Sequence, residues 1–253
     1  MEILHTDKNT WRKSALERPE VLYSKKNNKR IRSTLAKLDE FHITYEFNPL
    51  TEEFLEWFSP LYNNLIGKKK NAVLHDLYAK TLNDPNNKYE HWSLTVLQGN
   101  TSVGGAIIFT DETKLMFAYR AFNPKWPEGT LQASPSLLAE FIASTKAYQL
   151  NKKQVSHGKD RNLYGQNSDI GQLVYKLSVG YSPRLPIQKN DEALVIHKLD
   201  TSSITQDTVV LHYPKTGELI TEATLITSRE NEDNYNQLLH YPNLLKVDVV
   251  FRN

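Results

Sequence analysis

The sequence predicts an α+β fold in which a mixed, mostly antiparallel central sheet is flanked by helices and followed by a C-terminal β extension. Three observations support this prediction. Three strand-like segments with short connections lie between residues 92 and 121, amphipathic helical segments stand before and after them, and more strand-like segments follow residue 201. A chain of 253 residues can bury one large core, with or without an appendage.

The composition excludes several classes of protein. The net charge is only +2, so the field of the whole protein does not attract nucleic acid or membranes, and an anionic partner must be met locally. Because the chain has no cysteine, it has no disulfide, no thiolate metal site and no cysteine nucleophile. No run of 18 apolar residues occurs, and residues 1–10 are polar where a signal peptide would be apolar. We therefore expect a cytoplasmic protein without a membrane span.

Charge divides the chain into three expected segments. Residues 1–41 form a basic N-terminal extension, in which residues 24–38 carry six basic side chains and no acidic one. Its best helix covers residues 29–39, and the basic run either faces a phosphate-bearing ligand or is a solvated helix face. Residues 42–200 form the main domain. Residues 201–253 carry four basic and seven acidic side chains and form the β extension.

The first part of the main domain predicts a strand and two helices. Residues 42–47 alternate as a strand does, and Asn48-Pro49 ends it because proline cannot continue a ladder. Thr51 is the expected N-cap of a helix that Pro60 kinks. A second helix is expected over residues 73–82, followed by a loop at residues 84–87. The apolar face of the first helix consists of Phe54, Leu55, Phe58, Leu61, Tyr62 and Leu65.

The next residues predict an antiparallel meander. Strands are expected at residues 92–96, 103–109 and 115–121, with turns at residues 99–100 and 111–113. Gly104 and Gly105 lie inside the second of these strands. A glycine pair there permits a bulge or the close approach of another group.

The last part of the main domain alternates helices and strands. Ser134-Pro135 predicts the start of a long helix, and residues 154–157 a short strand. Ser168 is the expected cap of a further helix, which Gly180 ends in a left-handed conformation. Residues 193–199 are expected to form the last core strand. In the extension, strands are expected at residues 207–212, 218–227 and 244–251, and the extension either packs on a sheet edge or mediates a homodimer.

Three local stretches carry a resemblance to a known family. They are residues 103–107 (VGGAI), 133–138 (ASPSLL) and 171–181 (GQLVYKLSVGY), and together with the order of elements from about residue 42 to 199 they resemble the GNAT superfamily of N-acyltransferases. Among the branches of this superfamily, these stretches and the order of elements most resemble the Fem-type (FemAB-like) branch. This resemblance implies transfer of an acyl or aminoacyl group to an amine, with a small-molecule amine or a cell-wall precursor as acceptor.

The resemblance also implies a place for the acyl donor. GNAT proteins that use acyl-CoA hold its pyrophosphate on the amides of a glycine-rich turn before the long helix. Here the corresponding residues 125–134 read KWPEGTLQAS, with one glycine and a proline that removes an amide. Lys125, Gly129 and Ser134 are the candidate phosphate contacts, and Arg120 either grips a donor phosphate or forms a cross-strand ion pair. The departure favours the Fem-type branch and leaves aminoacyl-tRNA as the alternative donor.

Amine acylation needs a proton acceptor, a group that stabilises the carbonyl oxygen and a proton for the leaving group. The most titratable segment is residues 157–162 (HGKDRN), expected as a loop after the fifth strand, where His157 and Asp160 are candidate bases. Lys176 corresponds to the lysine of the family's tyrosine-lysine helix, which by resemblance lies near the acyl donor. Tyr175 and Tyr164 are candidate proton donors. The alternatives are an ordinary strand connection for the loop, a surface position for Lys176 and a core-edge position for Tyr175.

The sequence thus predicts an N-acyltransferase, and two other classes of function remain. A catalytically silent GNAT-like module would bind a metabolite or a protein, and a nucleic-acid-binding protein would use the basic segment at residues 24–38. No His-Glu-x-x-His motif, phosphate-binding loop motif or dinucleotide fingerprint is present, so no metal site is expected.

Overall fold

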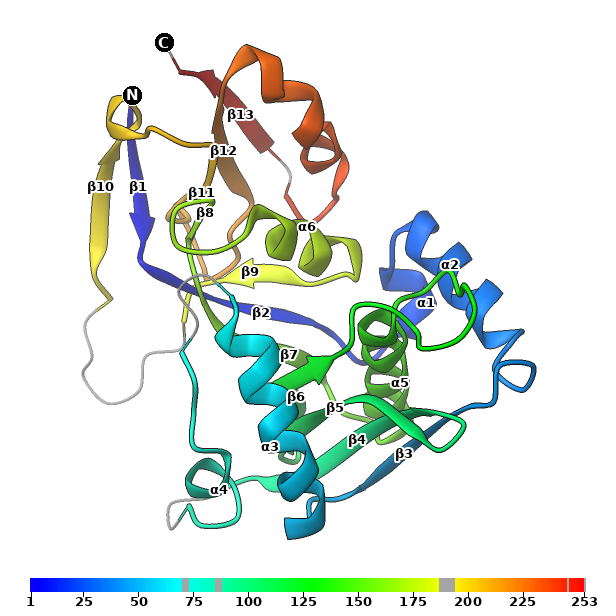
Figure 1. The fold of residues 1–253 in the computed structure, drawn as a ribbon. Helices are drawn as coiled ribbons and strands as arrows, with labels where there is room; N and C mark the ends of the chain where they lie inside the picture. Colours follow the sequence, from blue (N-terminus) through cyan, green and yellow to red (C-terminus); the bar gives the residue numbers. More distant parts are fainter. Residues whose placement is uncertain (70–72, 85–87, 187–193, 245, 253) are drawn as a thin grey trace. The chain divides into compact units, whose positions relative to one another are not determined.

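The computed structural model describes residues 1–69, 73–84, 88–186, 194–244 and 246–252. The chain divides into two compact units, and the strand β7 runs from one into the other. The first, which we call the meander unit, is Ser14–Ser156. The second, the terminal unit, combines Met1–Lys13 with His157–Asn253 (Figure 1).

The predicted meander is confirmed in the meander unit. The strands β3 (Ile43–Pro49), β4 (Glu90–Gln98), β5 (Thr101–Thr110) and β6 (Lys114–Phe122) are antiparallel neighbours in that order. The start of β7 (Gln154–Arg161) pairs with β6 in parallel. The sheet is therefore mixed and mostly antiparallel, as the sequence predicts.

The glycine pair of β5 allows the close approach that the sequence predicts. A Cβ atom at Gly105 would lie 2.9 Å from the carbonyl oxygen of Leu94 and 3.0 Å from the ring of Trp57. The β4–β5 register also shifts between Val96 and Leu97, next to Gly104. Both effects follow from the absence of a side chain at these two positions.

The helix that was expected after Thr51 has the predicted cap and apolar face. α3 (Glu52–Gly67) begins at Thr51, whose hydroxyl accepts a hydrogen bond from the Phe54 amide at 3.3 Å. The helix continues through Pro60. Its apolar face packs against side chains of β5 and β6, and the buried members of this cluster are Leu50, Phe54, Leu55, Phe58, Tyr62, Leu77, Ile107 and Ala121.

The prediction of a second helix over residues 73–82 is wrong in its length. α4 covers only Leu77–Lys80, and the apolar side chains of Val73 and Leu74 are exposed. Asp76 caps the helix by accepting a hydrogen bond from the Ala79 amide, so the chain is not helical before it. The expected loop at residues 84–87 lies mostly outside the described residues.

The meander unit has two further helical regions: α5 contacts β4, β5 and β6, and α1 and α2 contact α5. α5 (Pro135–Gln149) begins at Ser134 as predicted, and it is buried on most sides, including the carboxylate of Glu140. The short α1 (Pro19–Leu22) precedes α2 (Lys25–Leu35), which starts four residues earlier than the expected helix. The reason is Ser24, whose hydroxyl accepts a hydrogen bond from the Asn27 amide.

The N-terminal residues form strands that the sequence analysis did not predict. β1 (Glu2–Thr6) pairs antiparallel with β10 (Ile196–Asp200), and β2 (Lys8–Ser14) lies between β7 and β9 (Ser182–Arg184). The prediction of a last core strand at residues 193–199 is therefore wrong. This segment contributes β10 to a separate two-stranded sheet, and residue 193 lies outside the described residues.

The helix of the terminal unit has one corrected end and one confirmed end. α6 (Ile170–Ser178) is capped by Asp169, which accepts a hydrogen bond from the Gly171 amide, and not by Ser168. Gly180 follows with φ = 89°, the left-handed conformation that the sequence predicts.

The C-terminal β extension is confirmed. β8 (Leu163–Tyr164), β11 (Thr208–Leu211), β12 (Glu222–Thr227) and β13 (Lys246–Phe251) form one sheet in the order β13-β12-β11-β8. A short 3-10 turn, Thr201–Ser203, precedes β11. β12 and β13 are parallel, and the 3-10 segment Arg229–His240, which the sequence analysis did not predict, lies between them in the chain. Among the described residues, no helix has the length and apolar character of a membrane span.

Candidate functional site

Lys176 and Asp160, two of the predicted catalytic residues, form an ion pair in the terminal unit. Lys176 lies on the inner face of α6 beside Leu173 and Leu177, and Asp160 lies on β7. The side chain of Lys176 is 6% exposed and that of Asp160 is 16% exposed. A charged pair with so little exposure loses hydration on folding, so each charge depends on its partner.

Two buried aromatic side chains complete a cluster around this pair. The hydroxyl of Tyr164, on β8, donates a hydrogen bond to Asp160 at 3.1 Å and accepts one from the indole nitrogen of Trp11 at 2.8 Å. The Lys176 ammonium also lies 5.2 Å from the centroid of the Trp11 ring, a cation–π distance. The candidate site therefore consists of Lys176, Asp160, Tyr164 and Trp11.

The environment of Tyr164 keeps its hydroxyl protonated. Complete burial raises the pKa of Tyr164 well above its ordinary value, and the negative charge of Asp160 raises it further. Hydrogen bonds from Trp11 and Asn9 oppose this shift. Tyr164 is therefore a hydrogen-bond donor to Asp160 at neutral pH, and it holds one carboxylate oxygen in place.

Asn9, on β2, lies beside the same cluster. Its side chain is fully buried, and neither amide atom makes a hydrogen bond of regular geometry with a described residue. Its contact with the Tyr164 hydroxyl is therefore weak, although it still affects the pKa of that group. A buried amide with unmet donors and acceptors is costly, so Asn9 is the least satisfied polar group of this region.

The segment around His157 and Asp160 is not a loop, which corrects the sequence analysis. β7 continues to Arg161, so both side chains extend from a strand. His157 does not join Asp160 and Lys176 in the contacts described above. Its ring packs on the ring of Tyr181, with the centroids 4.2 Å apart. The Nζ atom of a second buried lysine, Lys13, lies 4.5 Å from the centroid of the same Tyr181 ring. Tyr175 is half-buried on α6, next to Lys176 in the chain.

The residues expected to contact the donor lie in the meander unit. Arg120, on β6, forms an ion pair with the buried Glu140 of α5 at 3.8 Å. The Ser134 hydroxyl accepts a hydrogen bond from the Leu137 amide at 3.3 Å, as an N-cap does. Lys125 and Gly129 are exposed in the loop that precedes α5.

Internal contacts occupy much of this loop. A Cβ atom at Gly129, where φ is 70°, would overlap the ring of Phe41. The Glu128 amide donates to the Gln98 side chain at 3.1 Å, and the Ala133 amide donates to the Thr34 hydroxyl at 2.9 Å. The amides that a pyrophosphate would need are therefore partly used, and these residues fit acyl-CoA poorly.

Sequence reasoning missed Trp11, which belongs to the candidate site, and Asn9, which lies beside it. Trp11 and Asn9 lie on β2, in a segment interpreted as a basic extension. The segment reads KNTWRKS, in which Trp11 is the one apolar residue, so no alternation marks it as a strand and nothing local indicates that it is inserted beside β7. Within the described residues, no group of three His, Asp or Glu side chains is placed to hold a metal ion.

Comparisons with known proteins concern the fold. The sequence matches no family model, and no curated protein matches it. Among solved structures, FemX superposes with a TM-score of 0.52 at 11% identity, covering 69% of this chain and 59% of the FemX chain. A Bacteroides thetaiotaomicron protein of unknown function gives 0.48 at 10% identity, covering 78% and 61% of the two chains. The C-terminal domain of a candidate lysylphosphatidylglycerol synthetase from Agrobacterium fabrum gives 0.46 at 9% identity, covering 72% and 60%.

The chain thus spans about 59% of the length of FemX. At this level of identity the likeness concerns the fold and not the reaction. The order of elements and the mostly antiparallel sheet agree with it. The protein has a GNAT-like fold close to that of the Fem-type proteins.

Proposed function

We propose that the protein transfers an acyl or aminoacyl group from an activated donor to an amine. The observation that carries this proposal is the poorly exposed Lys176–Asp160 pair, held by Tyr164 and Trp11 in a GNAT-like fold. Lys176 was expected from the family resemblance, and Asp160 was expected from the polar segment at residues 157–162. Because this chain spans only part of FemX, its acceptor and donor belong to the proposal as well.

Each residue has a role that its position supports. Asp160 accepts a hydrogen bond from the attacking amine and takes its proton, since the carboxylate is the most exposed polar group of the cluster. The Lys176 ammonium stabilises the negative charge that develops on the carbonyl oxygen. Tyr164 and Trp11 are positioning residues, because they act on the reacting groups through Asp160 and Lys176.

The donor and the acceptor follow from the same reasoning. The loop before α5 has few free amides for a pyrophosphate, which favours an aminoacyl-tRNA ester over acyl-CoA as donor. The acceptor is a small-molecule amine or a cell-wall precursor, as the Fem-type resemblance implies. No covalent enzyme intermediate is needed, since the amine nitrogen bonds directly to the activated carbonyl carbon. The bond from this carbon to the ester oxygen of the tRNA then breaks, and Asp160 gives the proton taken from the amine to the leaving oxygen.

Substitutions at the ion pair test the proposal. We expect Asp160→Asn to reduce turnover by about 10² to 10⁴-fold, because it removes the proton acceptor and keeps the shape of the side chain. Asp160→Asn also leaves the Lys176 charge without its partner, which destabilises the fold. The double variant Lys176→Met with Asp160→Asn removes both charges and should recover part of the lost stability. Turnover and urea unfolding are measured on the same samples.

The double variant separates catalysis from folding. If the pair is only structural, turnover returns together with stability, and the proposal is wrong. If the pair is catalytic, the double variant folds and stays inactive. Lys13→Met is the matched control, because Lys13 is also a buried lysine of the terminal unit and donates to the Val179 carbonyl at 3.1 Å. It should lose stability without a specific loss of turnover.

A ligand titration decides between the donors. A ligand at about 100 times its dissociation constant stabilises the folded state by roughly 2.7 kcal/mol. We therefore expect no shift in the melting temperature with acetyl-CoA or free CoA, and a shift with aminoacyl-tRNA. A dose-dependent shift with acetyl-CoA would contradict the preference for an aminoacyl ester, and no shift with any donor would favour a silent binding module.

A second candidate function is binding of a polyanion such as RNA by α2. The basic side chains of this region, Lys25, Lys26, Lys29, Arg30, Arg32 and Lys37, are all exposed. The helix carries no acidic side chain, so its surface has a local positive field despite the small net charge. This surface would also suit a tRNA donor.

Salt dependence tests this second candidate. Each phosphate contact contributes about 0.9 to the slope of log affinity against log salt concentration for double-stranded nucleic acid. Replacing Lys26 and Arg30 by Gln should reduce both the affinity for tRNA and the slope. An affinity that does not change with salt, or with these substitutions, would exclude α2 as the binding surface.

A further inference from the structure

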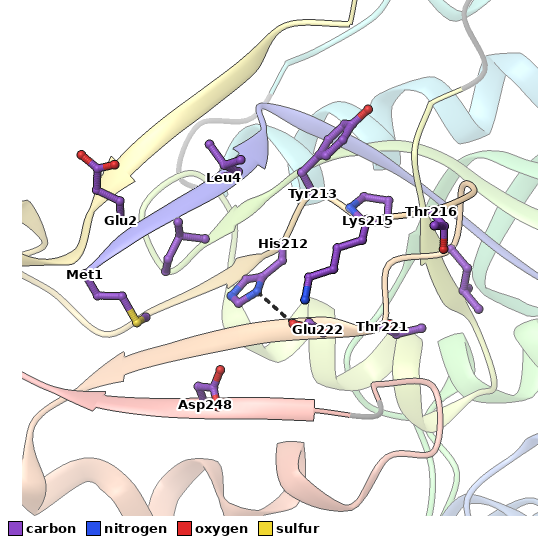
Figure 2. Close-up of a pocket in the computed structure, with 13 residues that line it drawn as sticks. Met1, Glu2, Leu4, His212, Tyr213, Lys215, Thr216, Thr221, Glu222 and Asp248 are labelled. Carbon is purple, nitrogen blue, oxygen red and sulfur yellow. Dashed lines mark ion pairs between the residues drawn. The ribbon is translucent and has the colours of Figure 1, made fainter.

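The terminal unit contains a cavity that the proposed function does not use. Its volume is about 450 Å³, within the range of small-molecule sites, and β1, β12, β13 and the hairpin after β11 contribute its walls (Figure 2). The Tyr213 amide donates to the Leu4 carbonyl at 2.7 Å and so fixes this hairpin to β1. The cavity is therefore formed by elements that are tied to one another.

Acidic groups line one side of the cavity. The Oε2 atom of Glu222 lies 3.7 Å from the Nδ1 atom of His212, whose other ring nitrogen is 2.8 Å from the Thr224 hydroxyl. Asp248 extends from the neighbouring strand β13 (Figure 2). Burial lowers the pKa of His212, and the charge of Lys246 adds to this effect, while Glu222 and Asp248 oppose it. The carboxylates of this side are Glu222 and Asp248, and Asp248 also forms an ion pair with Lys246 at 2.9 Å.

The cavity lining also includes a basic side chain, that of Lys215. Lys215 belongs to the hairpin after β11, and Figure 2 shows its side chain directed toward the interior between His212 and Glu222. With respect to the described residues, its ammonium makes no ion pair or hydrogen bond. A lysine that reaches over a cavity without a protein partner is suited to bind an anionic group of a ligand.

Apolar side chains also line the cavity. Ile3, Leu4, Pro214 and Leu219 belong to the lining, and Leu4 and Leu219 are 47% and 39% exposed. Such walls stabilise a ligand with an aliphatic part, because binding removes apolar surface from water. The lining also includes Glu2, whose carboxylate pairs with Lys198 at 3.8 Å. The cavity thus offers the carboxylates of Glu222 and Asp248, the Lys215 ammonium and an apolar surface.

We propose that this cavity binds a small zwitterion, namely an amino acid or a short peptide with free ends. Its ammonium group binds to Glu222 and Asp248, its carboxylate binds to Lys215, and its aliphatic side chain contacts Leu4 and Leu219. A simple anion fits less well because the two carboxylates repel it. A metal ion fits less well because Lys215 brings a positive charge. Within the described residues, no three His, Asp or Glu side chains are placed to hold a metal ion together. The site does not depend on the proposed transferase activity.

Calorimetric titration of the full chain with four probes tests the ligand chemistry. L-leucine and L-alanyl-L-leucine carry both charges, L-leucinamide lacks the carboxylate, and N-acetyl-L-leucine lacks the ammonium. We expect at least one zwitterion to bind about tenfold or more tightly than either analogue, since a hydrogen bond to a charged group is worth that much. Comparison of leucine with the dipeptide distinguishes the two sources of a zwitterion.

Two substitutions assign each end of the ligand. Glu222→Gln should weaken the zwitterion about tenfold and leave the binding of N-acetyl-L-leucine unchanged, whereas Lys215→Gln should weaken the zwitterion and leave L-leucinamide unchanged. Lys8→Gln, an exposed site outside the cavity, is the control and should change none of these affinities. The proposal is overturned if neither zwitterion binds at millimolar concentration, or if both analogues bind as tightly as the zwitterions.

Discussion

Lys176 illustrates how a single side chain depends on contacts that are distant in the sequence. Its helical position puts it beside Leu173 and Leu177, where a lysine usually extends to water. Here its ammonium meets Asp160 of β7 and the face of the Trp11 ring. The family resemblance pointed to Lys176 and the polar segment pointed to Asp160, but the pairing itself is a tertiary contact.

Gly129 gives a prediction at the residue scale. We expect Gly129→Ala to lower the free energy of unfolding by about 1–2 kcal/mol for the left-handed backbone, with about 1–3 kcal/mol more for the overlap with Phe41. The matched control is Gly99→Ala in the same unit. Gly99 is also left-handed, with φ = 57°, and a Cβ atom there meets nothing within 4 Å.

Urea unfolding of both variants measures the difference. A larger loss for Gly129→Ala than for Gly99→Ala assigns a structural role to Gly129 in packing the loop before α5. Equal losses would mean that the Phe41 ring moves aside easily, and the loop would then be more adaptable to a phosphate ligand than its contacts indicate.

At the scale of elements, strong periodicity and caps predicted α3, α5 and the meander well. Thr51 and Ser134 cap the helices that the sequence assigns to them. The errors concern segments whose conformation depends on a neighbour. β7 extends to Arg161 because it gains β2 as a partner, and β10 pairs with β1 instead of joining the central sheet. Local pattern does not encode such pairings, because strand propensity depends on tertiary context.

Ser134 gives a prediction at this scale, because it is both a cap and a candidate donor contact. We expect Ser134→Ala to cost about 1 kcal/mol of unfolding free energy through loss of the cap. Ser134→Asp keeps a capping oxygen and adds a negative charge near the helix N-terminus, so stability should be retained. Thermal and urea unfolding measure both effects.

The aspartate variant also tests the donor site. A donor phosphate at the start of α5 would be repelled by the new charge, so binding should weaken while stability is unchanged. If Ser134→Asp binds every tested donor as the unchanged protein does, the start of α5 is not a phosphate site, and Ser134 is a cap only.

Three histidines predict how the stability of the whole molecule depends on pH. Burial lowers the pKa of His5, His91 and His212, because each environment disfavours the charged ring. The unfolded chain takes up protons at the ordinary pKa of about 6.5, where the folded chain binds fewer. The contribution of these three histidines to the free energy of unfolding should therefore be fully present above that pH. It should decrease as the pH falls through about 6.5 and below it.

Urea unfolding over this pH range measures the effect. A variant with all three histidines replaced by Gln should lose less stability between neutral and mildly acidic pH than the unchanged protein. His240→Gln, at an exposed position, is the control and should keep the original pH dependence. An unchanged profile in the triple variant would assign the acid sensitivity to other groups.

The sequence by itself determined the fold class, the central meander, the capped helices and the β extension, since these follow from periodicity, caps and turns within short segments. It also pointed to Lys176 and Asp160. Only the tertiary structure decided that these two residues pair, that Trp11 and Tyr164 surround them, and that β1 and β2 are strands. The physical reason is that burial and pairing join residues far apart in the chain, and no local pattern specifies which segments meet.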